Sequence, residues 1–221
     1  MPSLVPLWQG IGAQLRCPSG WLGRLCGIAM TGLNAAPNRS AIDALKLKDG
    51  ESLLELGCGP GLALRASLQS QPQTRAIGLD WSRTMLAQAA RNNRRALSSG
   101  QINLVRGDFS KLPFAGDIVD AVLAVNVVYF MTSAAALREA HRVLRPGGRI
   151  VLYATDRSAM RHWPFARRHS HRLFDRSRLI GLLSDAGFTA KGIDVQTIDA
   201  GLGVKGLLAA ASKATGESPI R

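Results

Sequence analysis

Hydrophobic and polar positions alternate along the chain with two different periods. After Asn38, short runs rich in apolar residues, such as 52–56, alternate with longer stretches whose apolar residues recur at helical spacing, such as 82–97. Strands that alternate with helices are typical of a parallel sheet with crossover helices. The pattern predicts strands at 52–56, 75–80, 102–106, 118–124, 148–155, 190–198 and 205–212, and helices at 40–46, 61–70, 82–97, 133–144 and 175–186.

Two helix boundaries are marked by their own chemistry. Ser82 can accept a hydrogen bond from a free N–H of the first turn, which predicts a helix start before the apolar stripe at 85–90. Pro146-Gly147-Gly148 ends the helix of 133–144 and is expected to pass the chain to a strand at 149–153.

The first 38 residues differ from the rest of the chain. They contain no acidic residue, and apolar residues between 22 and 33 recur at the spacing of an amphipathic helix. We expect residues 1–38 to form a helical cover over the ligand site, residues 39–213 to form a single α/β domain, and residues 214–221 to form a flexible tail. An organellar transit segment is the alternative for the N-terminus.

The composition is that of a folded domain. Of 221 residues, 46% are hydrophobic and 19% are charged, and no apolar run reaches the roughly 18 residues that a membrane span needs. Cys17, Cys26 and Cys58 are odd in number and lack the spacing of metal ligands, so neither a disulfide framework nor a metal site is expected. A reducing, cytoplasmic location is the expectation that follows.

The net charge is strongly positive. It is +13, from 28 Lys and Arg against 15 acids, and seven arginines fall within 157–178. Such a surface favours an anionic partner, and peripheral contact with an anionic membrane is one hypothesis. A basic face that is simply solvated is the alternative.

The stretch 53–61, with the sequence LLELGCGPG, carries the first candidate chemistry. A buried strand leads into a loop whose glycines permit close approach of a ligand to the main chain. A dinucleotide fingerprint would need a third glycine where this chain has Leu62. Glu55 would repel a pyrophosphate at this strand end but would attract a cationic amino group. The loop residues expected to contact the ligand are Gly57, Cys58, Gly59 and Gly61.

Two further acidic residues follow strand ends. Asp80 ends the second predicted strand, where a carboxylate can accept hydrogen bonds from two ribose hydroxyls. Trp81 beside it can stack on an adenine or pack into the core. Asp108 ends the third strand, where it can accept from the exocyclic amine of adenine or cap the following turn, with Phe109 as a ring neighbour. These strand ends predict a nucleoside site.

The ordered series of E-x-G-x-G-x-G at 55–61, Asp80, Gly107-Asp108 and LRPGG at 144–148 resembles the class I methyltransferases that use S-adenosylmethionine. The resemblance covers about residues 40–212. It implies an α/β, Rossmann-like, seven-stranded and mostly parallel sheet of order 3-2-1-4-5-7-6, with the last strand antiparallel and helices on both faces. It also implies S-adenosyl-L-methionine as the cofactor. By family position, its contacts would be Glu55, Gly57, Gly59 and Gly61 for the methionine part, Asp80 for the ribose, Asp108 and Phe109 for the adenine, and Asn126 for the amino-acid end.

Within this family, the chain is most similar to the group that methylates small molecules, quinones and lipids. Enzymes that methylate amino groups of nucleic acids and proteins carry two prolines in the segment from Asn126 to Tyr129, and both are missing here. A small-molecule or lipid-like acceptor is therefore expected. The alternatives are an RNA methyltransferase that uses the basic surface, an NAD-dependent oxidoreductase, and a binding module without turnover.

Catalytic residues are harder to name than cofactor contacts. Methyl transfer by in-line displacement needs alignment and, for some acceptors, a base, but no protein nucleophile and no metal. His162 is the first candidate base because imidazole titrates near neutral pH. Asp156 is a comparable candidate, and Tyr129 is expected to line the acceptor pocket.

Overall fold

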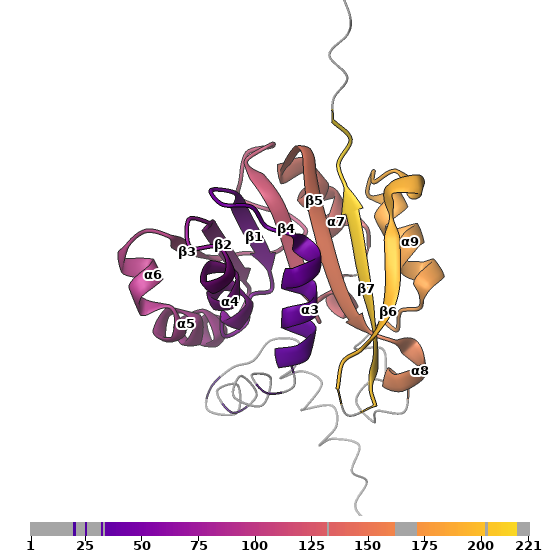
Figure 1. The fold of residues 1–221 in the computed structure, drawn as a ribbon, viewed down its shortest axis with the longest axis horizontal. Helices are drawn as coiled ribbons and strands as arrows, with labels where there is room; N and C mark the ends of the chain where they lie inside the picture. Colours follow the sequence, from indigo (N-terminus) through magenta and orange to yellow (C-terminus); the bar gives the residue numbers. More distant parts are fainter. Residues whose placement is uncertain are drawn as a thin grey trace, which may run out of the picture.

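A computed structural model of the protein describes residues 20, 25, 32, 34–131, 133–161, 172–201 and 203–215. Within this range, seven strands form one sheet in the order β3-β2-β1-β4-β5-β7-β6 (Figure 1). This order confirms the seven-stranded Rossmann-like fold. The strands are β1 (Ser52–Leu56), β2 (Arg75–Asp80), β3 (Ile102–Arg106), β4 (Val119–Val125), β5 (Leu144–Thr155), β6 (Asp194–Asp199) and β7 (Lys205–Ser212).

The strands pair in parallel except at β7. β1 pairs with β2 and β4, β2 with β3, and β4 with β5, whereas β7 lies antiparallel to both β5 and β6. Parallel neighbours need crossover connections, and most of these connections contain helices. The helices are α3 (Ala35–Leu45), α4 (Leu62–Ser70), α5 (Arg83–Asn92), α6 (Arg94–Ser98), α7 (Ala135–Val143), α8 (Arg157–Met160) and α9 (Arg176–Asp185), with 3-10 turns at η1 (Val128–Phe130) and η3 (Ala190–Gly192).

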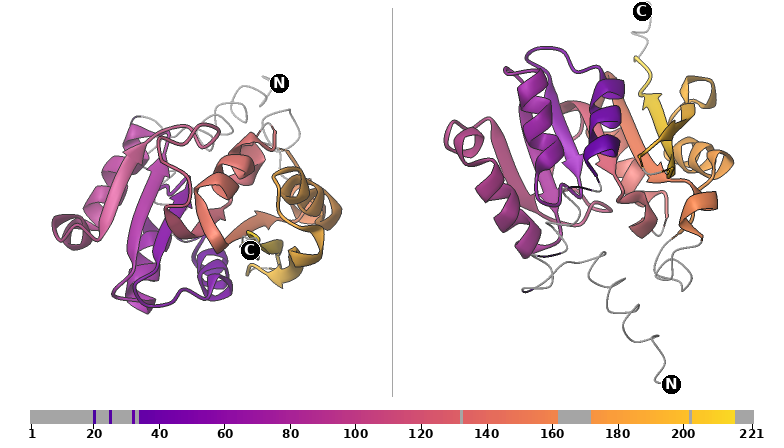
Figure 2. Two further views of the ribbon diagram at one scale, coloured as in Figure 1. Left: turned by 90° about the horizontal axis from the view of Figure 1, so that it is seen from above. Right: turned by 60° about the horizontal axis from the view of Figure 1, so that its bottom comes forward.

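Helices cover both faces of the sheet, as predicted. α3 and α4 lie on one face, and α7 and α9 lie on the other (Figures 1 and 2). One core cluster joins Leu54 to Leu137 of α7, and the other joins Leu53 to Leu45 of α3 and Leu64 of α4. Successive residues of β1 therefore face opposite helical layers, which explains why the central strands are apolar at nearly every position. None of the described helices is long and apolar enough to cross a membrane.

The helix predicted at 82–97 is in fact two helices, α5 and α6. The chain leaves the helical conformation at Asn93, where φ is -121° and ψ is 28°. The buried side chain of Asn93 donates hydrogen bonds of 2.9 Å to the carbonyl oxygens of Gly61 and Ala89. At this break, the Asn93 side chain connects the end of α5 to the glycine loop after β1. Local periodicity does not reveal this contact.

Pro146-Gly147-Gly148 lies inside β5 rather than between a helix and a strand. The helix α7 stops before this run, and β5 begins directly after the helix. The register against β4 passes from Val119 opposite Leu144 to Ala121 opposite Arg149, so β5 carries additional residues in this interval. The run therefore forms a bulge at the start of β5.

Other boundaries differ from the prediction by a few residues. α3 begins at Ala35 rather than near residue 40, and β6 begins at Asp194, after η3, rather than at 190. Most of the expected N-terminal cover lies outside the described residues. The division of the chain into 1–38, 39–213 and 214–221 therefore stays a prediction.

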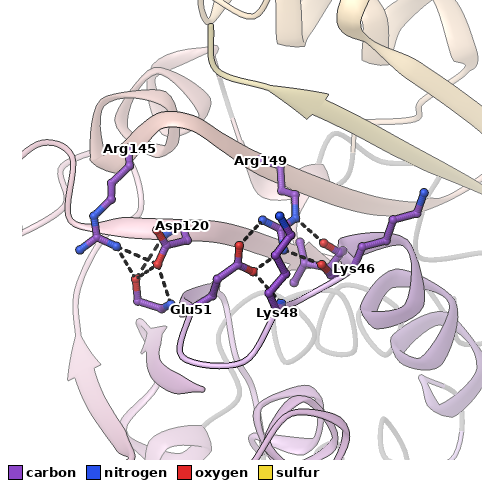
Figure 3. Close-up of polar contacts among 8 residues, drawn as sticks. Lys46, Lys48, Glu51, Asp120, Arg145 and Arg149 are labelled. Carbon is purple, nitrogen blue, oxygen red and sulfur yellow. Dashed lines mark hydrogen bonds and ion pairs between the residues drawn. The ribbon is translucent and has the colours of Figure 1, made fainter. Parts of the chain in front are cut away.

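Arg149 of β5 holds the C-terminal end of α3 on the sheet. Its guanidinium donates to the carbonyl oxygens of Leu45 and Lys46 at the end of the helix, and it forms an ion pair with Glu51 (Figure 3). A cation at a helix C-terminus satisfies carbonyl groups that have no partner within the helix, and it complements the helix dipole. The other end of α3 lies beside the pocket described below.

Candidate functional site

The candidate site lies at the carboxyl ends of the central strands, where the strand order reverses. β1 lies between β2 and β4 in the sheet, and such a reversal opens a crevice that ligands of α/β folds use. A pocket with an empty volume of ≈ 330 Å³, its open mouth included, lies at this end. It is lined by Asn34, Asn38, Glu55, Gly57, Cys58, Gly59, Pro60, Leu62, Ala63 and Val125.

Three glycines with positive φ shape the loop after β1. A Cβ at Gly57 (φ 66°) would meet Val127 Cγ2 at 2.6 Å, and a Cβ at Gly61 (φ 73°) would meet Asn93 Nδ2 at 2.6 Å. A Cβ at Gly59 (φ 51°), which lines the pocket, would meet nothing within 4 Å. Gly57 and Gly61 are therefore needed for packing, whereas Gly59 leaves room for a ligand against the main chain.

The end of α5 holds this loop in place. Asn92 Nδ2 donates to the carbonyl oxygen of Pro60 at 2.9 Å, and Asn93 Nδ2 donates to that of Gly61 at 2.9 Å. Sequence reasoning missed both asparagines, because each partner lies 32 residues earlier in the chain. The two amides fix the loop conformation from outside the pocket.

Glu55 is a buried carboxylate in the pocket lining. It is 4% exposed, and its Oε2 atom has no hydrogen-bond partner among the described residues. Burial raises the pKa of Glu55 well above its ordinary value, the backbone amide of Leu64 opposes the rise, and the charge of Asp80 adds to it. An ionised carboxylate here has no ion-pair partner among the described residues, so the site favours a cationic hydrogen-bond donor.

Asp80, at the end of β2, accepts two backbone hydrogen bonds. Its Oδ2 accepts from the Gly59 N–H at 2.8 Å, and its Oδ1 accepts from the Ser82 N–H at 2.7 Å. Burial raises the pKa of Asp80 above its ordinary value, although both amides lower it. Each carboxylate oxygen keeps a second lone pair, so the side chain can still accept hydrogen bonds from ligand hydroxyls.

The other residues expected on the nucleoside side lie at the ends of β2 and β3. Trp81 is 54% exposed, which excludes a core position. The Gly107 N–H donates to the Asp80 carbonyl oxygen and brings the two strand ends together. Asp108 is exposed and accepts from the Ser110 N–H at 2.8 Å, which is a turn-capping bond, and Phe109 is half-buried against the core.

Asn126 and Tyr129 are joined by a hydrogen bond after β4. The Tyr129 hydroxyl donates to Asn126 Oδ1 at 2.8 Å and accepts from the Thr155 N–H. Tyr129 is 5% exposed, and burial raises its pKa above the ordinary value. It does not belong to the pocket lining. The structure thus places Tyr129 behind Asn126 and keeps its hydroxyl protonated at neutral pH.

Asn34 and Asn38 line the pocket but carry no local sequence signal of a ligand site. Asn34 precedes α3, where an asparagine is typical of a helix cap, yet its Oδ1 accepts from Asn126 Nδ2 at 2.9 Å instead. His162 lies outside the described residues. Asp156 caps α8 by accepting from the Ser158 N–H at 2.7 Å.

Comparison with known proteins decides the family. Residues 54–152 match the family described as a methyltransferase domain, and this match contains the glycine loop, Asp80 and Asn126. Residues 54–152 are thus a methyltransferase domain, and the relatives described below support the class I S-adenosylmethionine-dependent type. The earlier resemblance is thereby confirmed.

Relatives of this chain are matched over different shares of its length. An uncharacterized methyltransferase of Bacillus subtilis is 29% identical over 136 residues, which is 61% of this chain and 73% of that protein. The malonyl-[acyl-carrier protein] O-methyltransferase of Dechloromonas aromatica is 41% identical over 101 residues, which is 45% of this chain and 35% of that protein. The chain matches only about a third of the length of two other curated relatives, 33% of one and 32% of the other.

Solved structures share the fold of this chain at low sequence identity. A Haloferax volcanii methyltransferase complex with the activator Trm112 has a TM-score of 0.73 and 20% identity, and the match covers 85% of this chain and 92% of that chain. A geranyl diphosphate methyltransferase in complex with GPP and sinefungin has a TM-score of 0.66 and 15% identity, with coverage of 81% and 78%. These likenesses support the fold.

Proposed function

We propose that the protein transfers a methyl group from S-adenosylmethionine to a small-molecule or lipid-like acceptor. The observation that carries the proposal is the Glu55 carboxylate, which is buried in the pocket with one oxygen unpaired among the described residues. The amino group of the cofactor is a cation that would supply the missing partner. A pyrophosphate at the same place would meet a like charge.

The cofactor would lie along the glycine loop and the end of β2. Gly57, Cys58 and Gly59 offer their main chain to the methionine part, because the open space at Gly59 admits close approach. Asp80 would accept the ribose hydroxyls. Its bonds from two backbone amides keep the carboxylate oriented before the ligand arrives, which reduces the ordering that binding requires.

The adenine would lie toward the end of β3. We propose the exposed Trp81 and the half-buried Phe109 as ring neighbours of the base, and Asp108 as the acceptor for its exocyclic amine. Asn126 would support the amino-acid end through Asn34, its hydrogen-bond partner at the pocket.

The bound cofactor supplies an activated methyl group for in-line displacement. The residues of this chain contribute orientation and exclusion of water, which are the main requirements of such a reaction. Tyr129 is protonated and buried, so it is not the base. His162 and Asp156 are the proposed candidates for accepting a proton from the methyl acceptor, where the acceptor carries one.

The acceptor class is proposed from the relatives. Their names describe methyltransferases for malonyl-[acyl-carrier protein], demethylmenaquinone and 24-methylenesterol. These acceptors are small or lipid-like groups, so we propose the same class here. Neither the NAD-dependent oxidoreductase nor the RNA methyltransferase is favoured.

We further propose a cytoplasmic enzyme that contacts anionic membranes peripherally. The segment 57–107 contains Asp80 as its single acid, and each nearby arginine on an anionic bilayer adds about 1 kcal/mol. Sedimentation with phosphatidylserine vesicles, compared with neutral vesicles at low salt, tests this contact. Equal partitioning would refute it. The exposed arginines of the segment are Arg65, Arg75, Arg83, Arg91, Arg94, Arg95 and Arg106.

Titration with S-adenosylhomocysteine and with NAD tests the cofactor. A ligand that binds only the folded state raises the melting temperature, and we expect this rise with S-adenosylhomocysteine alone. Stabilisation by NAD alone would refute the proposal. Incubation of the protein and a cell extract with methyl-labelled cofactor would then identify the acceptor by the label it gains.

A further inference from the structure

A chain of hydrogen bonds, which we call the amide relay, connects the end of β5 to the pocket. It begins at the Thr155 N–H, which donates to the Tyr129 hydroxyl oxygen. The Tyr129 hydroxyl donates to Asn126 Oδ1 at 2.8 Å, and Asn126 Nδ2 donates to Asn34 Oδ1 at 2.9 Å. Asn34 lines the pocket, so the relay ends at the ligand site.

The bonds of the amide relay run in one direction, from Thr155 to Asn34. The Thr155 N–H donates to the Tyr129 oxygen, and the Tyr129 hydroxyl directs its single proton to Asn126 Oδ1. Asn126 must then turn its carbonyl oxygen toward Tyr129 and its NH2 group toward Asn34. Since the two ends of an amide side chain are assigned by their partners, Tyr129 determines which end of each amide faces which neighbour.

The backbone holds Asn126 in place independently of this side-chain bond. Its φ is 56°, a left-handed conformation that asparagine tolerates better than most residues. Its N–H donates to the Tyr153 carbonyl oxygen at 3.0 Å. Loss of the Tyr129 hydroxyl would therefore release the rotation of the amide without displacing the residue.

The amide relay leaves a hydrogen-bond donor at one side of the pocket. Because Asn34 Oδ1 accepts from Asn126, the NH2 group of Asn34 is the end that can meet a ligand. Within the described residues, the Asn34 side chain makes no capping bond to the first turn of α3. It therefore does not occupy the helix amides, and the helix dipole adds positive potential at this end.

Glu55 presents the complementary group in the same pocket. Its Oε2 atom is a buried acceptor without a partner among the described residues. A pocket that combines an unpaired carboxylate with amide donors matches a zwitterionic amino acid. The ammonium group of such a ligand needs the carboxylate, and its carboxylate group needs the donors.

We infer that Tyr129 is a positioning residue that fixes the Asn34 amide as a donor to the carboxylate of the cofactor's amino-acid part. This inference rests on the proposed function. Tyr129 lies outside the pocket lining and acts through Asn126 and Asn34. It determines the direction of their amides and leaves the nucleoside contacts unchanged.

Calorimetry with two ligands tests this role. S-adenosylhomocysteine carries the amino-acid part, and 5′-methylthioadenosine has the same nucleoside and sulfur without it. In Tyr129→Phe, we expect the affinity for S-adenosylhomocysteine to fall about 3- to 10-fold, which corresponds to one weakened hydrogen bond, while the affinity for 5′-methylthioadenosine stays unchanged. Asn34→Asp replaces the donor by a carboxylate and should lower only the affinity for S-adenosylhomocysteine, by more than about 10-fold.

Tyr153→Phe is the matched control. Tyr153 is also a buried tyrosine, but it belongs to the core cluster on the opposite face of the sheet, so neither affinity should change. Asn34 lies at the start of a helix and is only half-buried, so Asn34→Asp provides the test if Tyr129→Phe does not fold.

Equal loss of both affinities in Tyr129→Phe and Asn34→Asp, or no loss in either variant, would overturn the role of Tyr129 alone. A wild-type protein that binds neither ligand would overturn the proposed cofactor, and the role of Tyr129 with it. Binding of both ligands by the wild-type protein therefore separates the two failures.

Discussion

The two ends of the sheet hold carboxylates in opposite electrostatic states. At the amino ends of the strands, burial raises the pKa of Glu51 and Asp120, but hydrogen bonds from arginine, Ser52 and the backbone outweigh it and hold both pKa values below their ordinary range (Figure 3). At the carboxyl ends, burial raises the pKa of Glu55 and Asp80. The ion pairs of the described residues include neither of these two.

This difference separates a structural end from a binding end. A paired carboxylate stabilises the fold, whereas an unpaired buried carboxylate destabilises it until a ligand supplies the cation. Both states occur around a single strand, because Glu51 comes directly before β1 and Glu55 lies within it. The position relative to the pocket, and not the type of residue, decides which state a glutamate has.

Glu55→Gln should cause the largest change in ligand binding. The neutral amide keeps the shape of the side chain and removes the charge that the ammonium group needs. We expect the affinity for S-adenosylhomocysteine to fall about 10- to 100-fold, as for a lost hydrogen bond between charged groups. The free energy of unfolding without ligand should stay the same or rise, because a buried unpaired charge is removed. Calorimetry and urea unfolding measure the two quantities.

Glu51→Gln is the matched control at the other end of the strand. It should lower the free energy of unfolding, because Arg149 loses its charged partner, and it should leave the affinity unchanged. If the two glutamine variants changed affinity and stability alike, the distinction between the two ends would be wrong.

Arg149→Leu should cause the largest loss of stability. The substitution leaves Glu51 and the last carbonyl oxygens of α3 without their partner. The side chains of the ion pair are 21% and 18% exposed, so we expect a loss of about 1–3 kcal/mol, below that of a fully buried pair. Urea unfolding measures it. Arg149→Lys keeps the charge but cannot reproduce the forked contacts, so its loss should be intermediate; a lysine variant as stable as the wild type would show that only charge matters.

Local sequence patterns predicted most of the fold and the two carboxylates at the carboxyl ends of the strands. The apolar runs place β1, β2 and β3 at their observed residues. Glu55 and Asp80 were found because a carboxylate at the end of such a run, next to glycines, is conspicuous. The order of the strands in the sheet could be predicted only from the resemblance to the family, since periodicity contains no information on which strands are neighbours.

Contacts between distant residues could not be predicted. Asn34 and Asn126 are 92 positions apart, and Arg149 and Glu51 are 98 apart. An asparagine or arginine has no local signal of such a partner, so the relay and the anchoring of α3 remained hidden. The break at Asn93 has the same cause, because Gly61 holds its side chain from another element.

The affinity for S-adenosylhomocysteine should depend on pH through Glu55, at the carboxyl ends of the strands. Only the ionised form of Glu55 attracts an ammonium group, and its folded-state pKa is raised. The affinity for S-adenosylhomocysteine should therefore fall as the pH decreases through that raised pKa. Calorimetry between pH 8 and pH 5 measures it. Glu55→Gln should remove this dependence, and a variant that kept it would assign the titration to another group.

Glu55 and Glu51 should contribute to the pH dependence of the free energy of unfolding with opposite signs. Because the pKa of Glu55 is raised, the unliganded folded protein binds the proton of Glu55 more tightly than the unfolded chain does. Glu55 therefore lowers the free energy of unfolding at pH values above its folded pKa. This effect disappears as the pH falls toward the unfolded pKa. The lowered pKa of Glu51 gives stability above its unfolded pKa, which is lost as the pH falls through its folded pKa. Urea unfolding of the two glutamine variants across this range separates the two contributions.

Arg145→Gln should cause the smallest effect, although its ion pair with Asp120 is as short as 2.7 Å. The two side chains are 46% and 25% exposed, and exposed pairs contribute about 0.2–1 kcal/mol. Asp120 also keeps its bonds from the Ser52 N–H at 2.8 Å and the Ser52 hydroxyl at 2.6 Å. The free energy of unfolding should therefore fall by less than about 1 kcal/mol, and 0.5 M salt should remove most of the difference. A loss as large as that of Arg149→Leu would mean that charge pairing alone, and not the capping of α3, stabilises this end of the sheet.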